Sequence, residues 1–292
     1  EEPNALVTVG DGAFAEPNIR APMQELYDGL VARSQNAWPS LERDVLAVND
    51  LLAPFLSAGF YYKTFMWPKS FWEGLYEPFI RRAAGLGALS GESNPSRYAR
   101  AFAHCDVLVI GAGPAGLRAA RVAAEAGLDV ILADESWDMG GRLLSETLSI
   151  DGRPGADWAV EEAQALAAIG VRRMTRTTVT GAYDGGIFGA LERRGHHGPA
   201  TADAPRECFW RLKTRRAILC AGALERPIAF PNNDRPGIML AGAARSYLNR
   251  FGVAPGARVA VFGNNDSAHQ TARDLVAAGV NVTAVIDSRA EV

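Results

Sequence analysis

Residues 106–134 constrain the fold of this chain more than any other stretch. They read, in order, DVLVI, GAGPAG, LRAARVAAEAG and LDVILAD. This is the pattern of a buried strand, a glycine-rich turn, a helix stopped by Gly127 and a second strand. Because the connections are short, the two strands are expected to run parallel with the helix crossing between them. The sequence therefore predicts a βαβ unit and an α/β fold.

The turn at residues 111–116 has the spacing G-x-G-x-x-G of the dinucleotide-binding fingerprint, in the strand–turn–helix context that the fingerprint requires. Gly111 allows the tight turn, Gly113 lets a pyrophosphate approach the backbone, and Gly116 lets the helix pack on the strand. The start of the helix then offers free N–H groups and partial positive charge to the phosphates. The predicted loop is completed by Ala112, Pro114 and Ala115.

Two carboxylates, Asp134 and Glu135, follow the second strand, where a dinucleotide-binding domain places the acid that binds the ribose hydroxyls. They would repel a 2′-phosphate, so NADP is disfavoured relative to NAD or FAD. The pair Gly140-Gly141 comes next and is typical of flavoproteins with two dinucleotide-binding domains. Arg142 follows where it could reach a phosphate or a ribose.

A β-meander is predicted in residues 171–216, where short apolar stretches alternate with turns. The strand ending in ILCAG, residues 218–222, is expected to return to the parallel sheet beside the first strand. Its end would then lie next to the nucleotide. Ala221 and Gly222 are interpreted as small because a larger side chain would fill the space of the ligand.

The chain also contains a second copy of the same unit, RVAVFGNNDSAHQTARDLVAAGVNVTAVID, at residues 258–287. Its loop keeps Gly263, but Asn265 and Ala268 replace the second and third glycines. Asn265 would direct its side chain toward a pyrophosphate, and Asp266 adds a negative charge where phosphates would lie. We expect the fold to be retained and the ligand to be lost or altered.

Three regions are predicted, together forming a Rossmann-like two-dinucleotide-binding-domain flavoprotein fold (parallel sheet plus β-meander) with an N-terminal α+β region. They are an aromatic-rich region at 1–100, a nucleotide-binding domain at 101–235 and the start of a degenerate second nucleotide-binding domain at 236–292. Both ends of the sequence have the character of a fragment of a longer subunit.

The aromatic-rich region contains two features of note. A helix capped by Ser40 is expected within residues 39–56. The segment FYYKTFMWP, residues 60–68, is dense in rings of the kind that form cores or subunit interfaces. The rings favour a subunit interface in region 1–100, and the resemblance given below implies in addition that this region is a ferredoxin-like remnant.

Composition excludes several functions. With 292 residues, 48% of them hydrophobic, and a net charge of -3, the chain has no basic character that would favour nucleic acid or an anionic membrane. No run of about 18 apolar residues predicts a membrane span. Three cysteines in no motif spacing indicate reduced thiols in a cytoplasmic protein. The lack of a C-x4-C pair after the glycine loop argues against a disulfide reductase. No metal site and no catalytic residue are assigned.

The chain resembles the alpha subunits of heterotetrameric sarcosine oxidases. In residues 1–100 the resemblance rests on EEPNALV, ELYDGLVARSQNAWPSL, AGFYYKTFMWP and YEPFIRRAAGLG. Further along it rests on CDVLVIGAGPAGLRAA, LADESWDMGGRL and LCAGALERPIAFPNNDRPGIMLAGAARSYLNRFGV. The aromatic segment is specific to this family and its nearest relatives, whereas many flavoproteins share the glycine loop.

The resemblance implies an oxidative demethylation, in which sarcosine and oxygen give glycine, a one-carbon unit (formaldehyde or methylene-tetrahydrofolate) and hydrogen peroxide. It implies a heterotetramer with beta, gamma and delta subunits, FAD in the beta subunit, FMN at the alpha–beta interface and NAD in the glycine-loop domain of the alpha subunit. The folate-handling region would lie beyond Val292. Carried over by position, the NAD contacts are Ala115 with its flanking glycines, Asp134, Glu135, Arg142, Val179, Ala221 and Gly222.

One departure and one alternative accompany the resemblance. Related dehydrogenase subunits carry a ferredoxin-like iron–sulfur domain at the N-terminus, but no cysteine precedes Cys105, so no such cluster is expected in residues 1–100. The fingerprint recognises the ADP half that NAD and FAD share, and it does not choose between them. The alternative is therefore an FAD-binding subunit of an opine or amino-acid dehydrogenase, similar to cyanide synthases.

Overall fold

The computed structural model describes residues 6–35, 37–48, 51, 67–231, 233 and 237–291. The chain divides into two compact units. One comprises Glu1–Arg97 with Gly195–Arg206, and the other comprises Tyr98–Arg194 with Glu207–Val292. Every residue predicted to bind the cofactor belongs to the second, larger unit.

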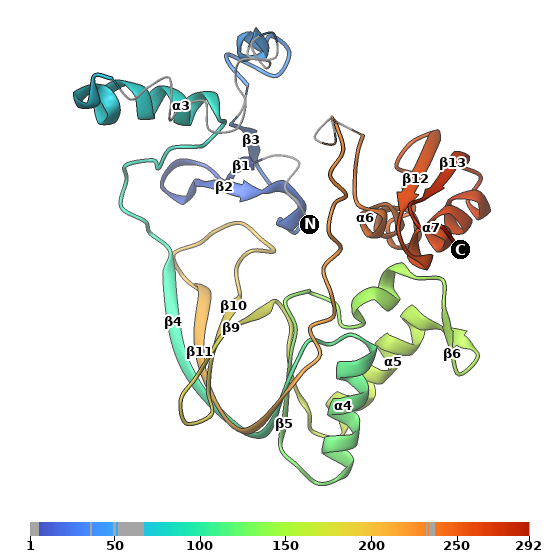
Figure 1. Ribbon diagram of the computed structural model, residues 1–292. Coiled ribbons are helices and arrows are strands. Elements are labelled where there is room, and N and C mark those ends of the chain that lie inside the picture. The colour runs from blue at the N-terminus through green and yellow to red at the C-terminus, as the bar shows by residue number, and fades with distance from the viewer. Residues whose placement is uncertain are drawn as a thin grey trace. The chain divides into compact units, whose positions relative to one another are not determined.

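A six-stranded sheet in the order β8-β5-β4-β11-β10-β9 forms the framework of the larger unit (Figure 1). β4, β5 and β8 are parallel, whereas β9, β10 and β11 form antiparallel pairs. The predicted parallel sheet and β-meander are thus confirmed. The strands are β4 (Arg97–Ile110), β5 (Val130–Ala133), β8 (Arg172–Met174), β9 (Thr177–Tyr183), β10 (Ile187–Arg193) and β11 (Pro205–Leu219).

The return strand β11 lies beside β4, as the sequence predicts. The two run in the same direction, because Thr214 Oγ1 donates to Asp106 O at 3.2 Å and Cys220 N donates to Ile110 O at 2.7 Å. The carboxyl ends of β4 and β11 therefore meet at one edge of the sheet. This edge is where open α/β sheets bind ligands.

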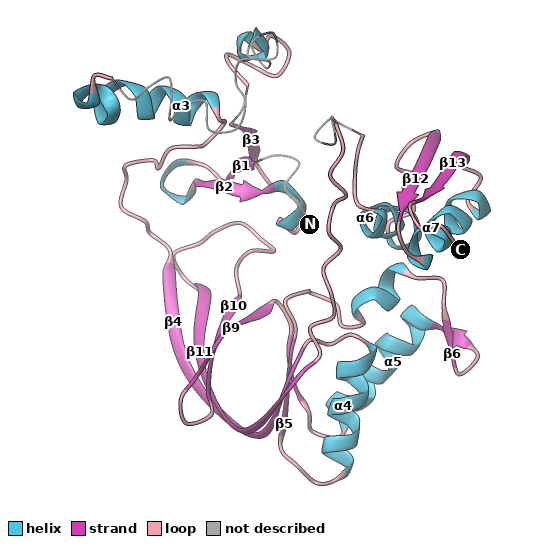
Figure 2. Cartoon of the chain, in the orientation of Figure 1, coloured by secondary structure: helices cyan, strands magenta, loops and turns pink. Residues whose placement is uncertain are grey.

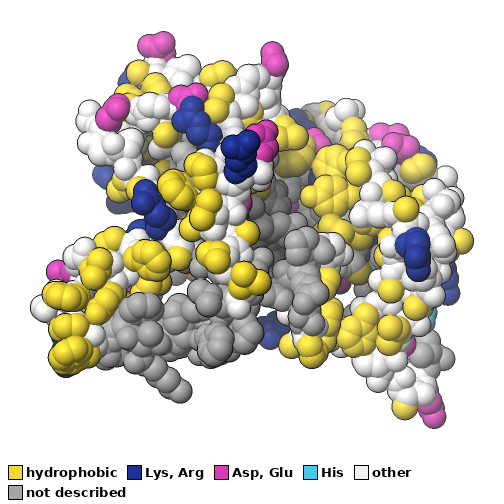
Figure 3. Space-filling model, turned by 90° about the horizontal axis from the view of Figure 1, so that it is seen from above, with side chains coloured by type: hydrophobic (Ala, Val, Ile, Leu, Met, Phe, Trp, Pro, Cys, Tyr) yellow, Lys and Arg dark blue, Asp and Glu magenta, His cyan; other side chains and the backbone are white. Residues whose placement is uncertain are grey.

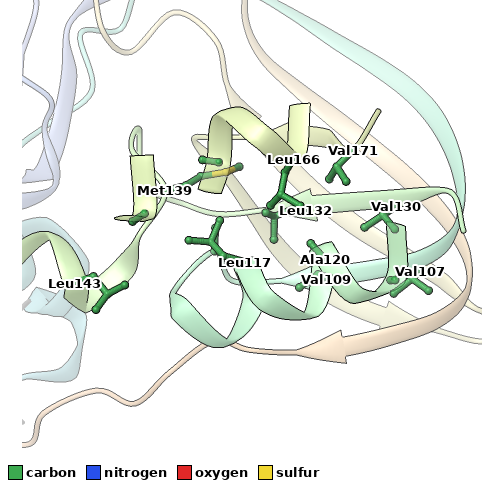
Figure 4. Packing of buried hydrophobic residues seen from close by; sticks show 14 of the residues in the cluster. Val107, Val109, Leu117, Ala120, Val130, Leu132, Met139, Leu143, Leu166 and Val171 are labelled. Carbon is green, nitrogen blue, oxygen red and sulfur yellow. The ribbon is translucent and has the colours of Figure 1, made fainter. Parts of the chain in front are cut away.

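Two helices, α4 (Pro114–Glu125) and α5 (Gly155–Ala168), pack against each other next to the parallel strands (Figures 1 and 2). Their apolar side chains and those of β4 and β5 form one core cluster, which includes Val109, Leu117, Leu132 and Leu166, each fully buried (Figure 4). Burial of a large aliphatic side chain contributes about 1.5–3 kcal/mol. This cluster fixes the helix that begins at the glycine loop.

A second core cluster joins the parallel strands to the meander and includes Leu108, Ile131, Cys208 and Leu212. Successive residues of β4 alternate between the two clusters, since Val107 and Val109 belong to the first and Leu108 to the second. The continuous apolar run of this strand is thus explained by burial on both faces. A short hairpin, β6 (Ser149–Ile150) and β7 (Arg153–Pro154), precedes α5.

The predicted second βαβ unit is present. β12 (Arg258–Gly263) and β13 (Asn281–Asp287) are parallel, and α7 (Asp266–Ala277) connects them. The register shifts at Val259/Ala260, so that Val259 pairs with Val282 and Ala260 with Ala284. This extra residue in β13 makes the second copy one residue longer and aligns Asp287 with Asp134. Helix α6 (Ala241–Arg245) continues into a π-helical turn, Ser246–Arg250, which packs beside α7.

The N-terminal unit has a three-stranded sheet in the order β2-β1-β3, with both pairs antiparallel. Its strands are β1 (Leu6–Val9), β2 (Glu16–Arg20) and β3 (Ala32–Ser34). Its helical elements are Gly12–Phe14, Ala21–Met23, Val45–Ala47, Lys69–Phe71, Trp72–Tyr76 and α3 (Glu77–Ala83). The expected α+β character of this region is therefore present in the described residues.

The predicted helix start at Ser40 is wrong. The first helical turn is Val45–Ala47, and Asp44 caps it by accepting from Leu46 N at 2.9 Å. The same carboxylate also accepts from Trp38 N at 3.0 Å, whereas Ser40 Oγ accepts from Arg43 N at 3.3 Å, ahead of the helical turn. Most of the predicted helix beyond residue 48 lies outside the described residues.

The aromatic segment at 60–68 also lies outside the described residues, except for its last two positions. One of these, Trp67, is 84% exposed, and Phe79 on α3 is 68% exposed. Hydrophobic side chains are spread over the face of the molecule seen in Figure 3. Among the residues that the structure describes, no helix is both long and apolar enough to cross a bilayer.

Candidate nucleotide-binding site

The glycine loop begins where β4 ends. Gly111 has φ +98°, a conformation that favours glycine, and its N–H donates to Ala133 O at 2.8 Å. A Cβ at this position would overlap the carbonyl oxygen of Cys220. Gly111 is therefore required both by its backbone conformation and by the close approach of β11.

Gly116 lies one turn into α4 and faces the start of the loop. A Cβ on Gly116 would overlap the carbonyl oxygen of Gly111. The backbone of the helix therefore contacts the backbone of the turn directly, and glycine is the residue that allows this contact. The roles that the spacing predicts for Gly111 and Gly116 agree with this geometry.

Gly113 differs from these two glycines. Its φ is −69°, which any residue adopts, and a Cβ there would meet nothing within 4 Å. Packing within the protein gives no reason for a glycine. The open space lies at the N-terminus of α4, whose N-cap residue has no capping side chain and whose first turn has no acidic residue. These residues fit a diphosphate, because the helix end is positive, no side chain caps the N–H groups after Pro114, and the position of a Cβ on Gly113 is unfilled. We call this unfilled position the open cradle.

Asp134 is bound to the loop. Its Oδ2 accepts from Ala112 N at 2.6 Å, and its Oδ1 accepts from Ser136 N at 2.8 Å. Each carboxylate oxygen has a second lone pair, so these bonds leave acceptor capacity for a hydroxyl group. Glu135 is exposed, and its carbonyl oxygen accepts from Arg193 at 2.6 Å. Sequence spacing suggested the ribose role of Asp134 but not its second task, which is to hold the glycine loop.

The Gly-Gly pair lies directly against the loop. Gly140 N donates to Ala112 O at 2.8 Å. Gly141 has φ +54°, and a Cβ on it would be 2.9 Å from Gly113 Cα. Arg142 therefore begins one residue from the open space at Gly113, and its Nη2 is 2.9 Å from Glu146 Oε1.

The end of β11 completes the edge. Gly222 has φ +69°, a conformation that favours glycine, and a Cβ there would meet nothing within 4 Å. Glu225 follows and accepts from Ala241 N at 3.2 Å and from Gly242 N at 2.7 Å. This carboxylate caps α6, a role that local sequence patterns did not indicate.

Val179 comes two residues after Thr177, whose N–H donates to Asp134 O at 2.7 Å. It lies in β9 opposite Ala190 and packs, partly buried, against the second core cluster. The other candidates gather around the carboxyl ends of β4, β5 and β11. The assignment of Val179, which came from the resemblance alone, stays a prediction.

In the matching loop of the second unit, the side chains bond to groups of the protein itself. Asn265 caps α7, and its Oδ1 accepts from Ser267 N at 3.0 Å and from Ser267 Oγ at 2.7 Å. Arg289 Nη2 lies 2.8 Å from both Asp266 and Asp287. His269 Nε2 is 2.7 Å from Asp287 Oδ2. Hydrogen bonds from Arg289 and then from His269 hold the pKa of Asp287 well below its usual range.

The three cysteines of the chain are free. Burial is the first cause that raises the pKa of each thiol, in Cys105, Cys208 and Cys220. Raised values disfavour the thiolate that redox chemistry and nucleophilic attack require. Cys220 is closest to the glycine loop, and nothing in its surroundings activates it.

A model of the family described as "Pyridine nucleotide-disulphide oxidoreductase" matches residues 105–292. The chain belongs to this family. Membership in the pyridine nucleotide-disulphide oxidoreductase family confirms the predicted nucleotide-binding α/β class and an oxidoreductase relationship. The three cysteines of this chain form no disulfide.

The resemblance noted from the sequence is confirmed. The chain is 57% identical over 290 residues to the sarcosine oxidase alpha subunit of Rhizobium meliloti (strain 1021), covering 99% of this chain and 29% of that protein. It is 34% identical over 189 residues to an opine oxidase subunit of Agrobacterium tumefaciens (strain Ach5), covering 63% of this chain and 37% of that protein. The chain thus spans less than a third of the sarcosine oxidase polypeptide.

Among solved structures, L-proline dehydrogenase from P. horikoshii is similar with a TM-score of 0.53 and 24% identity, covering 67% of this chain and 38% of that chain. At this identity the likeness concerns the fold alone. It supports the Rossmann-like architecture that the glycine loop predicts.

Proposed function

We propose that this chain is the NAD-binding part of the alpha subunit of a sarcosine oxidase. The observation that carries the proposal is the open cradle at Gly113 in a chain that is 57% identical to a sarcosine oxidase alpha subunit. Gly113 is conformationally ordinary and unpacked. A ligand phosphate at this position would account for the lack of a side chain, and packing within the protein does not require it.

The residues of the loop divide the work of binding. N–H groups at the start of α4 would bind the diphosphate, and Arg142 would add a positive charge beside it. Asp134 would accept from the ribose hydroxyls while holding Ala112 in place. Glu135, exposed beside it, would exclude a 2′-phosphate by repulsion. In this proposal NAD is bound tightly and is not turned over, so this chain's part is to hold and orient it.

By the same proposal, the reaction belongs to the complete complex: sarcosine is oxidatively demethylated to glycine and a one-carbon unit, with production of hydrogen peroxide. FAD would lie in the beta subunit, with FMN at the alpha–beta interface, in a heterotetramer with gamma and delta subunits. Tetrahydrofolate would accept the one-carbon unit outside residues 1–292. The complex would be cytoplasmic. No residue of this chain is assigned to the chemical step.

A second candidate is an FAD-binding dehydrogenase subunit. The 34% identity to an opine oxidase polypeptide favours it. The glycine loop does not separate the candidates, because both cofactors present the same ADP half to it.

The released cofactor separates the two candidates. We expect the purified full chain, denatured after extensive washing, to release a colourless nicotinamide dinucleotide that mass spectrometry identifies as NAD. A yellow flavin would support the dehydrogenase instead. A chain that releases no dinucleotide and binds neither NAD nor FAD in calorimetry would contradict both. Sarcosine-dependent peroxide production by the complete complex tests the substrate.

A further inference from the structure

Four charged side chains of alternating sign extend from the glycine loop into the second half of the larger unit. Arg142 Nη2 is 2.9 Å from Glu146 Oε1, and Arg245 Nη1 is 3.5 Å from the same oxygen. Arg245 Nε then donates to Asp274 Oδ2 at 2.8 Å. The exposed fraction of these side chains falls along the series, from 64% for Arg142 to 14% for Glu146 and 4% for Asp274.

The inner end of the series is fixed. Besides the bond from Arg245, the carboxylate of Asp274 accepts from Thr147 at 3.1 Å, from Asn249 at 3.0 Å and from Gln270 at 2.9 Å. Burial by itself would raise the pKa of Asp274, but the hydrogen bonds from Gln270, Asn249 and Arg245 outweigh it and lower the pKa. The pair of Arg245 and Asp274 is therefore a buried, fully charged anchor.

The outer end of the series lies beside the proposed phosphate site. Gly141 contacts the backbone of Gly113 so closely that a Cβ would come within 2.9 Å of it. The side chain of Arg142 starts at the next residue. An exposed arginine samples many rotamers, and a fixed carboxylate partner restricts them before a ligand arrives.

We propose that Glu146, held in place by Arg245, is a positioning residue that orients Arg142 toward the phosphates of the bound dinucleotide. This inference rests on the proposed function, because it assigns Arg142 to that ligand. With the ligand bound, the charges would alternate from phosphate through Arg142, Glu146 and Arg245 to Asp274. Glu146 thereby links the cofactor site to α6 and α7 of the second βαβ unit.

The test compares ADP with adenosine on full chains freed of bound nucleotide. ADP carries the diphosphate that NAD and FAD share, and adenosine lacks it. We expect Glu146→Gln to weaken ADP binding about fivefold in calorimetry and to leave adenosine binding unchanged. We expect Arg142→Met to weaken ADP binding about tenfold. Adding Glu146→Gln to Arg142→Met should then cause no further loss, which a merely structural role of Glu146 would not produce.

A matched control and three outcomes decide the matter. Glu161 pairs with Arg153 on the solvent side of α5, and Glu161→Gln should change neither ligand's affinity. If Glu146→Gln leaves ADP binding intact, or tightens it by releasing Arg142, the positioning role is wrong while the proposed function stands. If losses of the two variants add independently, the coupling is also refuted. If the unsubstituted chain binds neither ADP nor adenosine, the proposed function itself fails.

Discussion

The two glycine loops of this chain share one architecture and differ at the position that matters for a ligand. Both helices begin at the matching residue, Pro114 in α4 and Asp266 in α7. The N-cap of α4 is Gly113, which has no side chain, whereas the N-cap of α7 is Asn265, whose side chain accepts from Ser267 N. No side chain of the first loop caps α4, whereas the side chain of Asn265 in the second loop caps α7. The two βαβ units therefore differ in what satisfies the first turn of the helix.

The backbone of the two loops differs as well. Gly111 has φ +98° and contacts β11, while the matching Gly263 does not have a positive φ. Gly116 contacts Gly111 through bare backbone, whereas the second loop has Ala268 at the matching position. A Cβ on Gly263 would overlap the side chain of Ala268, so the second turn is also close, but only the first turn brings backbone against backbone. Substitutions at that backbone contact should therefore damage the first loop most.

The largest effect is expected from Gly116→Ala. The new methyl would overlap the carbonyl of Gly111, so the helix must move away from the turn. We expect a loss of about 4 kcal/mol in the free energy of unfolding, measured by urea denaturation, with loss of bound cofactor. The matched change in the second loop, Ala268→Gly, should cost only about 1 kcal/mol. Equal losses of stability in Gly116→Ala and Ala268→Gly would show that the two turns do not differ in their packing.

A smaller effect on stability and a large one on binding are expected from Gly113→Asn, which copies the second loop into the first. A Cβ meets nothing within 4 Å there, and asparagine can cap α4. Stability should therefore stay the same or rise by a few tenths of a kcal/mol, while affinity for NAD falls by about 100-fold because the side chain fills the phosphate position. Calorimetry and urea denaturation on one preparation measure both. Cofactor retained at native affinity would mean that the cradle at Gly113 is not a phosphate site.

The reciprocal change tests the second loop. Asn265→Ala removes the cap of α7, and we expect a loss of about 1 kcal/mol in the free energy of unfolding. Binding of NAD should not change, because Asn265 belongs to the self-capped loop. A variant in which a second equivalent of NAD binds would show instead that this asparagine alone keeps the site closed.

The sequence revealed the first loop almost completely, because its requirements are local. Glycine spacing, the strand before it and the helix after it fix the turn, so the fold and the places of Gly111 and Gly116 could be predicted. The degenerate second unit was predicted because its strand, loop and helix also follow a local pattern, in residues 258–287. A local pattern also gave one wrong prediction. The sequence favoured Ser40 as the cap of the helix, whereas Asp44 caps it in the structure.

What the sequence could not reveal depends on contacts between distant residues. Glu146 and Arg245 are 99 positions apart, and Thr147 and Asp274 are 127 apart. No periodicity or spacing rule relates them, since their contact follows from how α6 and α7 pack in the larger unit. Glu225 was missed for a similar reason, as it caps a helix that begins 16 residues later.

The smallest expected effect is on the pH dependence of stability, and it concerns the aspartates after the second strand of each βαβ unit, Asp134 and Asp287. Asp134 accepts from the backbone of its own loop, whereas Asp287 accepts from Arg289 and His269, and Arg289 also reaches Asp266. Hydrogen bonds from Arg289 lower the pKa of Asp287 in the folded state. The folded chain therefore releases this proton more readily than the unfolded chain. The resulting stability is present above the unfolded pKa of about 3.9 and is lost as the pH falls below it.

Asp287→Asn should accordingly make the free energy of unfolding depend less on pH below about pH 4. Near neutral pH it should remove only the contribution of the ion pair with Arg289. Urea midpoints measured from neutral pH down to about pH 3 would show this as a shallower slope than in the unsubstituted chain. Asp184→Asn, on an exposed turn, should keep the original slope. Added salt should reduce the difference, because solvent ions screen an ion pair near the surface. A slope unchanged by Asp287→Asn would mean that Arg289 and His269 do not hold this carboxylate in solution.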